Sequence, residues 1–171
     1  MPLSLYDASV PVFRQILGAL AAIIDKAAAH AEAKKIDPAV LINARLYPDM
    51  FPFQRQVFIA TDFGKGASAR LAGVEVPKFE DTETTFPELK ARIQKTLDFI
   101  ATLKPAQFEG AETRDVTIQL RGGQETFKGR AYLFHFALPN FYFHATTAYD
   151  ILRHNGVELG KPDFIHQIIK D

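Results

Sequence analysis

The segment LPNFYFHATTAYDILRHNG, at residues 138–156, predicts the last helix of a helical protein. Its apolar residues recur at steps of three and four, which places them on one face of an α-helix. Extended back by one turn, the stripe consists of Phe134, Leu138, Phe141, Ala145, Ala148 and Leu152. We expect the helix to begin near Gly129 and to end at Asn155-Gly156, because asparagine and glycine suit a left-handed cap. Pro139 predicts a kink or a split into two helices.

Three earlier segments carry stripes with the same spacing, at residues 4–34, at 53–71, and from 86 to the break at Pro105. The stripes are Tyr6, Val10, Phe13, Leu17, Leu20 and Ile24; then Phe53, Val57, Ala60, Gly64, Ala67 and Leu71; and then Phe86, Leu89, Ile93, Leu97 and Ile100. Pro11 predicts a bend or a late start in the first helix. Small residues such as Gly64 would let another helix approach the second one closely. Because amphipathic helices bury their stripes against each other, we predict an all-α, four-helix bundle that forms one domain over residues 1–171.

The connecting segments predict features that a simple bundle lacks. The polar segment 73–85 is longer than a connection between two adjacent antiparallel helices needs to be. Its length is compatible with a crossover that runs along the bundle. Thr85 followed by Glu88 gives a capping box at the start of the next helix. Between residues 113 and 127, apolar and polar residues alternate around a turn that contains glycine, which predicts a small β-hairpin before the last helix. A lone hairpin is marginal in water, so it should lie against the bundle.

The composition excludes several classes of function. The 171 residues include 20 basic and 20 acidic ones, so the chain lacks the excess positive charge that nucleic-acid binding and polybasic membrane attachment need. It has no cysteine, which excludes disulfides, thiolate metal sites and a cysteine nucleophile. The first residues lack the pattern of a signal peptide, and no apolar run approaches the length of a membrane span, so we expect a cytoplasmic protein.

His144 is the most informative of the five histidines. It lies on the inward side of the last helix, with Asn140 one turn earlier on the same face. Two interpretations stay open: these side chains form the polar floor of a pocket between helices, or His144 is a buried histidine satisfied by a neighbouring polar group. We expect His30, His154 and His166 to be solvated, since they lie near segment ends. No two histidines have the spacing that brings two ligands to one metal ion.

Two aromatic and charged clusters also have alternative interpretations. Arg45, Tyr47 and Asp49 would lie near the mouth of the bundle, where they either bind a small anion or form a salt bridge within the loop. Tyr142 and Phe143 make the last helix apolar nearly all round, and such a helix is covered on several sides. We therefore expect these two rings to contact the hairpin or a second subunit.

Three motifs make the chain similar to a known family. They are LYDASVPVF at residues 5–13, PDMFPFQRQV at 48–57, and the segment at 138–156 quoted above. They resemble the DUF1993 proteins, and the resemblance covers nearly the whole chain. That family is similar in fold to the DinB/YfiT-like four-helix bundles, so the resemblance implies this fold. Members of the family are of unknown function, so it implies no activity.

The resemblance also bears on metal binding. DinB-like relatives often hold a divalent metal with three histidines, one on the second helix and two at a spacing of four on the last, and some activate a low-molecular-weight thiol. Only His144 matches this set. The ligand position one turn earlier carries Asn140, a poor ligand for zinc or nickel, and no histidine lies from Gln56 to Asp62, where the remaining one should fall. The resemblance thus implies a bundle without the standard site, and we predict no cofactor.

These observations leave two hypotheses for the function. The first is a small-molecule-binding or non-catalytic homodimer whose candidate ligand-binding residues are Gln56, Asp62, Asn140 and His144. Asp62 reaches the interior if the second helix is rotated; otherwise it is solvated. The second is a divergent DinB-like metal-dependent enzyme, of the thiol-transfer or isomerase type, that recruits Asn140, His144 and Asp62.

Overall fold

The computed structural model describes residues 4–167 and confirms a mainly helical bundle. Its long helices are α1 (Val10–Lys34), α3 (Phe53–Ala72), α4 (Phe86–Thr102) and α6 (Leu138–His154). The shorter elements are α2 (Pro38–Ile42), η1 (Pro105–Phe108), α5 (Gly129–Tyr132), the π-helical η2 (Leu133–Ala137) and α7 (Lys161–Ile165). The strands β1 (Asp115–Leu120) and β2 (Gly123–Lys128) form the hairpin.

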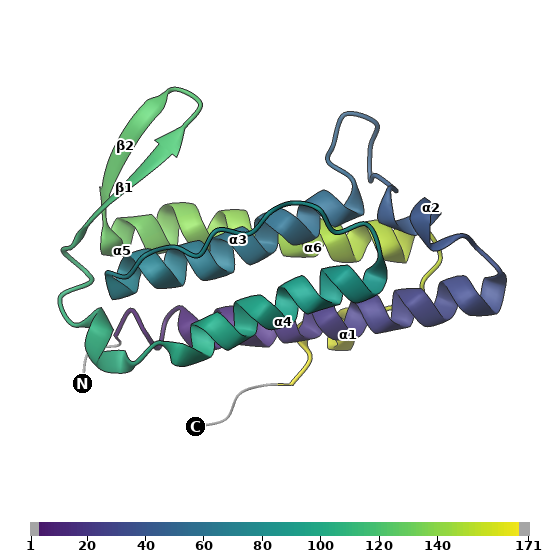
Figure 1. Ribbon diagram of the computed structural model, residues 1–171, viewed down its shortest axis with the longest axis horizontal. Helices are drawn as coiled ribbons and strands as arrows, with labels where there is room; N and C mark the ends of the chain where they lie inside the picture. The colour runs from purple at the N-terminus through teal and green to yellow at the C-terminus, as the bar shows by residue number, and fades with distance from the viewer. Residues whose placement is uncertain (1–3, 168–171) are drawn as a thin grey trace.

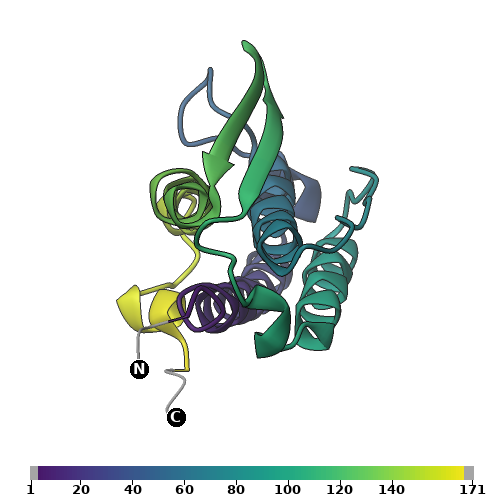
Figure 2. The ribbon, with the colours of Figure 1, turned by 90° about the vertical axis from the view of Figure 1, so that its left-hand side faces the viewer.

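The long helices occupy the corners of the bundle in the order α1, α4, α3 and α6, so that α1 lies diagonally opposite α3 (Figure 2). In Figure 1, α1 and α6 run in one direction, and α3 and α4 run in the other. Because α3 and α4 are parallel neighbours, the connection between them, residues 73–85, has to return along the length of the bundle, as Figure 1 shows. This confirms the predicted crossover. The predicted capping box also forms, with the Thr85 side chain accepting from the Glu88 N–H.

The stripe predicted for α3 is completely buried and lies at the centre of the molecule. At Gly64 the stripe lies tightly against α1, because a Cβ atom built there would lie 3.1 Å from Cδ1 of Leu17. A larger residue would push the diagonal helices apart, so Gly64 has a packing role, as predicted. In α1 the helix begins late, at Val10, with Pro11 in its first turn, where a missing N–H costs nothing.

The stripe predicted for the first half of the last helix is wrong by one residue. Phe134 is 40% exposed, whereas Leu133 and Ala137 are fully buried. The cause is η2, since a π turn holds about one residue more than an α turn and so displaces all earlier side chains around the axis. Pro139 follows this turn directly and lacks the N–H of a regular helix. The chain stays helical from Gly129 to His154, so Pro139 does not split it; the distortion is the π turn before it.

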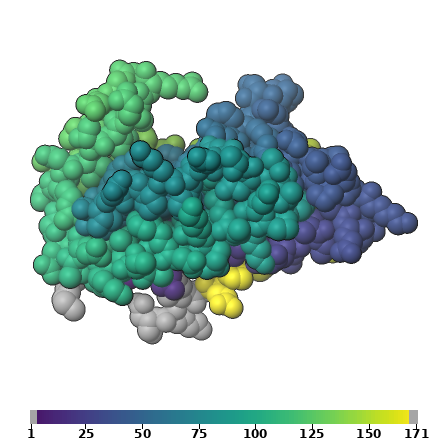
Figure 3. Space-filling model, in the orientation of Figure 1, coloured from purple at the N-terminus to yellow at the C-terminus, as the bar shows by residue number. Residues whose placement is uncertain are grey.

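The hairpin has the predicted position, and its register places Gln119 opposite Gln124 beside the turn. Its tip projects beyond the helices, as Figures 1 and 3 show. Its base packs on the bundle through Phe127, whose ring centroid lies 5.7 Å from that of Phe136 and 6.4 Å from that of Tyr132. The loop at residues 43–52 projects on the same side at the other end. The surface of α3 and α6 between these projections is called the α3–α6 face below.

The C-terminal part of the chain returns to the body of the bundle. Gly156, with a φ of 91°, ends α6 as predicted, and α7 then packs on α1. From the sequence we expect the last residues of the chain to be loose, but residues 168–171 lie outside the described residues, as do residues 1–3. In the part of the chain that the structure describes, no helix combines the length and the apolar character needed to cross a membrane.

Candidate functional site

Gln56 and His144, two of the four predicted site residues, meet on the α3–α6 face. Gln56 lies in the first turns of α3 and is almost fully buried, while His144 lies in the middle of α6 and is half-buried. Nδ1 of His144 and Oε1 of Gln56 are 2.7 Å apart, a short hydrogen bond between the two helices. Gln56 is therefore the polar partner of His144, and the use of this pair as the floor of a binding pocket stays a prediction.

The contacts of Gln56 determine which nitrogen of His144 carries the proton. The Gln56 side-chain Nε2 donates to the Phe51 carbonyl at 3.1 Å, so the amide oxygen faces His144. An amide oxygen only accepts hydrogen bonds, so Nδ1 of His144 has to donate. In the neutral ring Nε2 then carries a lone pair. Within residues 4–167 nothing bonds to Nε2, and no buried side-chain nitrogen or oxygen lacks a partner, so Nε2 is accessible to solvent.

The surroundings of the imidazole ring keep it uncharged. The Phe63 ring lies nearly parallel to it at 6.3 Å between centroids, and the Phe143 ring meets it edge-on at 5.2 Å. Burial among these groups lowers the pKa of His144 from 6.5 to about 4, because the charged ring would lose its hydration. At pH 7 His144 is therefore a neutral ring with one free acceptor.

Asn140 and Asp62 are placed differently from this pair. The Asn140 side-chain Nδ2 donates to the Phe136 carbonyl at 2.8 Å, within its own helix. The Asp62 carboxylate, half-exposed on α3, forms ion pairs with Lys65 and with Arg92, the latter at 3.0 Å. Neither side chain is hydrogen-bonded to His144 in the described part of the chain. Their role in ligand binding stays a prediction.

The groups around His144 do not fit the metal that the fold family implies. A zinc or nickel site needs several imidazole or carboxylate ligands directed at one point. Here the side chain bonded to the imidazole is the carboxamide of Gln56, and the Asn140 carboxamide one turn earlier is bonded to the backbone. Among residues 4–167, no cluster of three or more histidine, cysteine, aspartate or glutamate side chains is arranged to hold an ion.

Sequence reasoning missed an ionic cluster centred on Arg92. The Arg92 side chain is fully buried and pairs with Asp62 and Asp81 at 3.0 Å and with Glu83 at 3.2 Å. Its Nε also donates to the Thr61 hydroxyl at 2.8 Å. The cluster fastens the crossover 73–85 to α3 and α4, and so fixes the orientation of Asp62.

Two signals in the sequence pointed to this cluster. Arg92 adjoins Ile93 and lies between the stripe residue Leu89 and Thr96, so a cation occupies the inner side of an amphipathic helix. A buried arginine needs acidic partners, and the acidic run at 80–83 in the crossover provides them. Only the fold shows that the two segments meet.

The remaining predicted residues are arranged as follows. Arg45 donates to the Met50 carbonyl, and in the described chain it forms no ion pair with Asp49, so the predicted loop salt bridge is not observed. His154 and His166 are exposed, as predicted, whereas His30 is half-buried.

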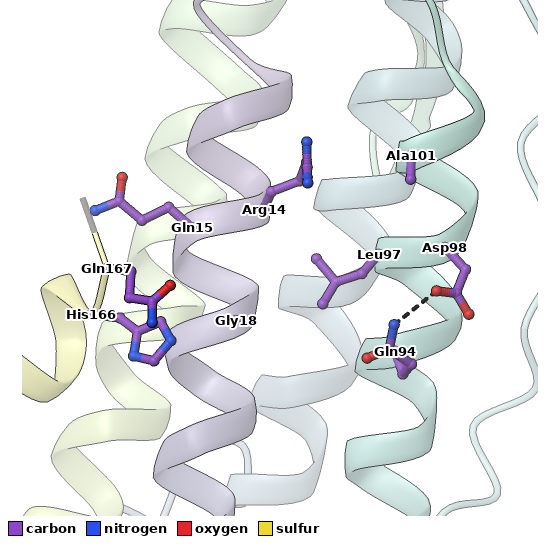
Figure 4. A pocket seen from close by; sticks show the side chains of 9 residues that line it. All are labelled: Arg14, Gln15, Gly18, Gln94, Leu97, Asp98, Ala101, His166 and Gln167. Carbon is purple, nitrogen blue, oxygen red and sulfur yellow. Dashed lines mark hydrogen bonds between the residues drawn. The ribbon is translucent and has the colours of Figure 1, made fainter. Parts of the chain in front are cut away.

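A hollow of about 420 Å³ lies between α1 and α4, on the side of the bundle opposite the α3–α6 face (Figure 4). Arg14 and Gly18 line it from α1, and Gln94 and Asp98 line it from α4. The Gln94 side chain donates to Asp98 at 2.7 Å along the same helix. These two polar groups therefore satisfy each other and do not converge on the hollow.

The parallel α3–α4 pair, the crossover and the hairpin before the last helix define the class of this protein as a DinB-like four-helix bundle. A crystal structure of a DinB family member from Shewanella denitrificans is similar over 98% of this chain and 94% of that one, with a TM-score of 0.91 and 44% sequence identity. The chain belongs to the DUF1993 family, described as a domain of unknown function, whose family model matches residues 5–165. No curated protein matches it. The resemblance found in the sequence is thus confirmed.

Proposed function

We propose that this protein binds a small molecule on the α3–α6 face, with Nε2 of His144 as the recognition group. The observation that carries the proposal is the hydrogen bond from His144 to Gln56, because it fixes the tautomer and directs a free acceptor away from the helix contact. Ligand sites in helical bundles typically combine a few placed polar groups with aromatic walls. Phe63 and Phe143 supply such walls beside His144.

The chemistry of Nε2 defines the ligand. A neutral imidazole with a free lone pair accepts a hydrogen bond, so the ligand donates an N–H or O–H at this point. The Phe63 ring, which lies nearly parallel to the imidazole, favours a ligand with an apolar body next to the donor. The proposed activity is therefore the binding of a neutral, partly aromatic donor, without metal chemistry.

A comparison of phenol with toluene tests this proposal. We expect phenol to shift the histidine ring signals of His144 saturably in NMR spectra of the protein labelled at histidine, and toluene to shift them much less. The variant His144→Phe should lose phenol binding, while His154→Gln, at an exposed histidine, should retain it. Equal shifts with phenol and toluene, or phenol binding that survives His144→Phe, would contradict the proposal.

We also propose that a second copy of the chain covers the aromatic patch formed by Tyr47, Phe51 and Phe143. These rings are 45–65% exposed, which is unusual for large apolar side chains. The Gln56 side chain brings the loop that carries Tyr47 and Phe51 to α6, because it bonds both the Phe51 carbonyl and His144, the residue after Phe143. The hairpin, by contrast, packs on Phe136 and Tyr132, so it is not what covers Phe143.

Light scattering at micromolar concentration tests the dimer. The proposal predicts twice the chain mass of 19.1 kDa, reduced to one chain mass by Phe143→Glu. Phe134→Glu, at an exposed ring outside the patch, should leave the dimer intact. A monomeric mass for the unmodified protein would refute the proposal.

Metal analysis separates binding from the alternative of a divergent metal-dependent enzyme. Protein purified without added metal, and then supplied with zinc, nickel and iron, should retain none stoichiometrically. Stoichiometric metal that is lost in His144→Gln would support the enzyme.

A cytoplasmic location also stays a prediction, which fractionation of cells that express the tagged chain would check.

A further inference from the structure

A second hollow, of about 320 Å³, lies under the hairpin. Residues of α3, β1, α5 and η2 line it, and Figure 1 shows the hairpin and α5 at one end of the bundle. Its aromatic wall is formed by Phe63, Tyr132 and Phe136, and Ile118 and Leu120 of β1 close it from the hairpin side. It is large enough for a single-ring molecule, and most of its lining is apolar. The polar groups that reach it therefore determine what it binds.

Arg70 is the cation in this hollow, and it has no acidic partner. Its Nη1 donates to the Tyr132 hydroxyl at 3.3 Å, and within residues 4–167 no carboxylate lies within ion-pair distance of it. Most of its N–H donors are therefore open to a ligand. Burial raises the pKa of Tyr132, although Arg70 opposes the rise, so the hydroxyl is protonated and leaves the positive charge of Arg70 in place.

Gly66 makes room for the Arg70 guanidinium. A Cβ atom at position 66 would lie 2.6 Å from Nη1 of Arg70, closer than atoms can approach. The Arg70 guanidinium thus lies over Gly66, one helical turn before the Cα atom of Arg70, where no side chain occupies the space. Because the obstructing group would be the end of a flexible side chain, alanine at this position would displace the charge without disturbing the backbone.

Asp62 also lines the hollow, but its carboxylate forms ion pairs with Lys65 and Arg92. It belongs to the cluster in which Arg55, Lys65 and Arg92 pair with Asp62, Asp81 and Glu83. That cluster holds equal numbers of cations and carboxylates. Asp62 therefore does not neutralise Arg70, and an anion that enters the hollow meets an uncompensated positive charge next to aromatic rings.

We propose that this hollow is a binding site for a small aromatic carboxylate. The carboxylate accepts paired hydrogen bonds from Arg70, a geometry that the planar guanidinium favours. The ring of the ligand lies among Phe63, Tyr132 and Phe136. The site goes beyond the proposed function, because it uses none of the polar groups of the Gln56–His144 pair: Phe63 contacts His144 on one side and the hollow on the other.

A series of ligands with one ring and different charges tests the proposal by calorimetry or NMR titration. Benzoate should bind the unmodified protein, and neutral benzamide and cationic benzylamine should bind at least about tenfold more weakly, as expected for the loss of a charged hydrogen bond. Phenyl phosphate distinguishes a specific carboxylate site from a general anion site, since binding as tight as that of benzoate would contradict the carboxylate assignment. Absence of benzoate binding, or equal binding of benzamide, would overturn the proposal.

Variants test the role of Arg70 without relying on one substitution. Arg70→Gln should weaken benzoate binding about tenfold or more. Gly66→Ala should weaken it several-fold while the thermal midpoint of unfolding does not fall, because alanine favours helix. Gly18→Ala is the matched control on α1, where the new Cβ atom meets only ordinary contact at 3.9 Å, and it should leave benzoate binding unchanged. Benzoate affinity that survives both Arg70→Gln and Gly66→Ala would refute the site.

Discussion

Lowering the pH from 7 to 5 should destabilise this protein through His144. In the folded chain burial holds the pKa of His144 at about 4, against 6.5 for the ordinary side chain. Between these values the unfolded chain binds a proton that the folded chain does not, so unfolding becomes more favourable as the pH falls. The stabilisation is complete above pH 6.5 and is lost progressively as the pH falls toward 4.

The size of the effect follows from the shift and from the exposure of the ring. At about 1.36 kcal/mol per pKa unit, the full shift corresponds to roughly 3 kcal/mol. His144 is half-buried and its Nε2 reaches solvent, so water screens part of this energy. We therefore expect a loss of about 1 kcal/mol between pH 7 and pH 5.

Urea unfolding at the two pH values measures this loss, with His144→Gln as the reference. Glutamine does not titrate, so the difference in unfolding free energy between the unmodified protein and the variant should change by about 1 kcal/mol between pH 7 and pH 5. If the difference for His144→Gln is constant instead, the ring is not buried in its neutral form and the reasoning fails.

Three further substitutions test the packing that positions the site. Arg92→Met should cost about 3 kcal/mol in urea unfolding, because it removes the fully buried partner of several carboxylates. It should also speed hydrogen exchange in the crossover 73–85, and a loss below about 0.5 kcal/mol would contradict a structural role for the cluster. Gly64→Val should lower stability by at least about 2 kcal/mol, since its side chain would overlap Leu17 on α1; unchanged stability would mean that the diagonal helices are not in contact. Thr85→Ala should cost about 1 kcal/mol by removing the cap that accepts from the Glu88 N–H, with no measurable cost as the contradicting result.

The parts of the fold that repeat a local pattern could be predicted from the sequence. The α3 stripe, the hairpin and the capping box depend on residues that are close in the chain. The stripe of the last helix failed before Pro139 because the π turn adds a residue, and the sequence alone gives no count of residues per turn. Pro139 correctly indicated a distortion in this part of the last helix. The distortion is a change of side-chain register at the π turn and not a split into two helices.

The candidate site was predictable only in part, because its contacts join distant segments. The pattern of the last helix made His144 a candidate, but its bond to Gln56 requires the register between α3 and α6. The role of Asp62 depended on Arg92, which the crossover brings to it. The vacancy at Gly66 that accommodates Arg70 is visible only in the helix geometry.

The tautomer of His144 tests the account most directly. In ¹⁵N NMR spectra of the uniformly labelled protein at pH 7, the account predicts that Nδ1 of His144 carries the proton and that Nε2 has the shift of an unprotonated ring nitrogen. The variant Gln56→Leu should remove this preference between the two nitrogens. A proton on Nε2, or a ring charged at pH 7, would contradict the claim that a neutral acceptor is held open on the α3–α6 face.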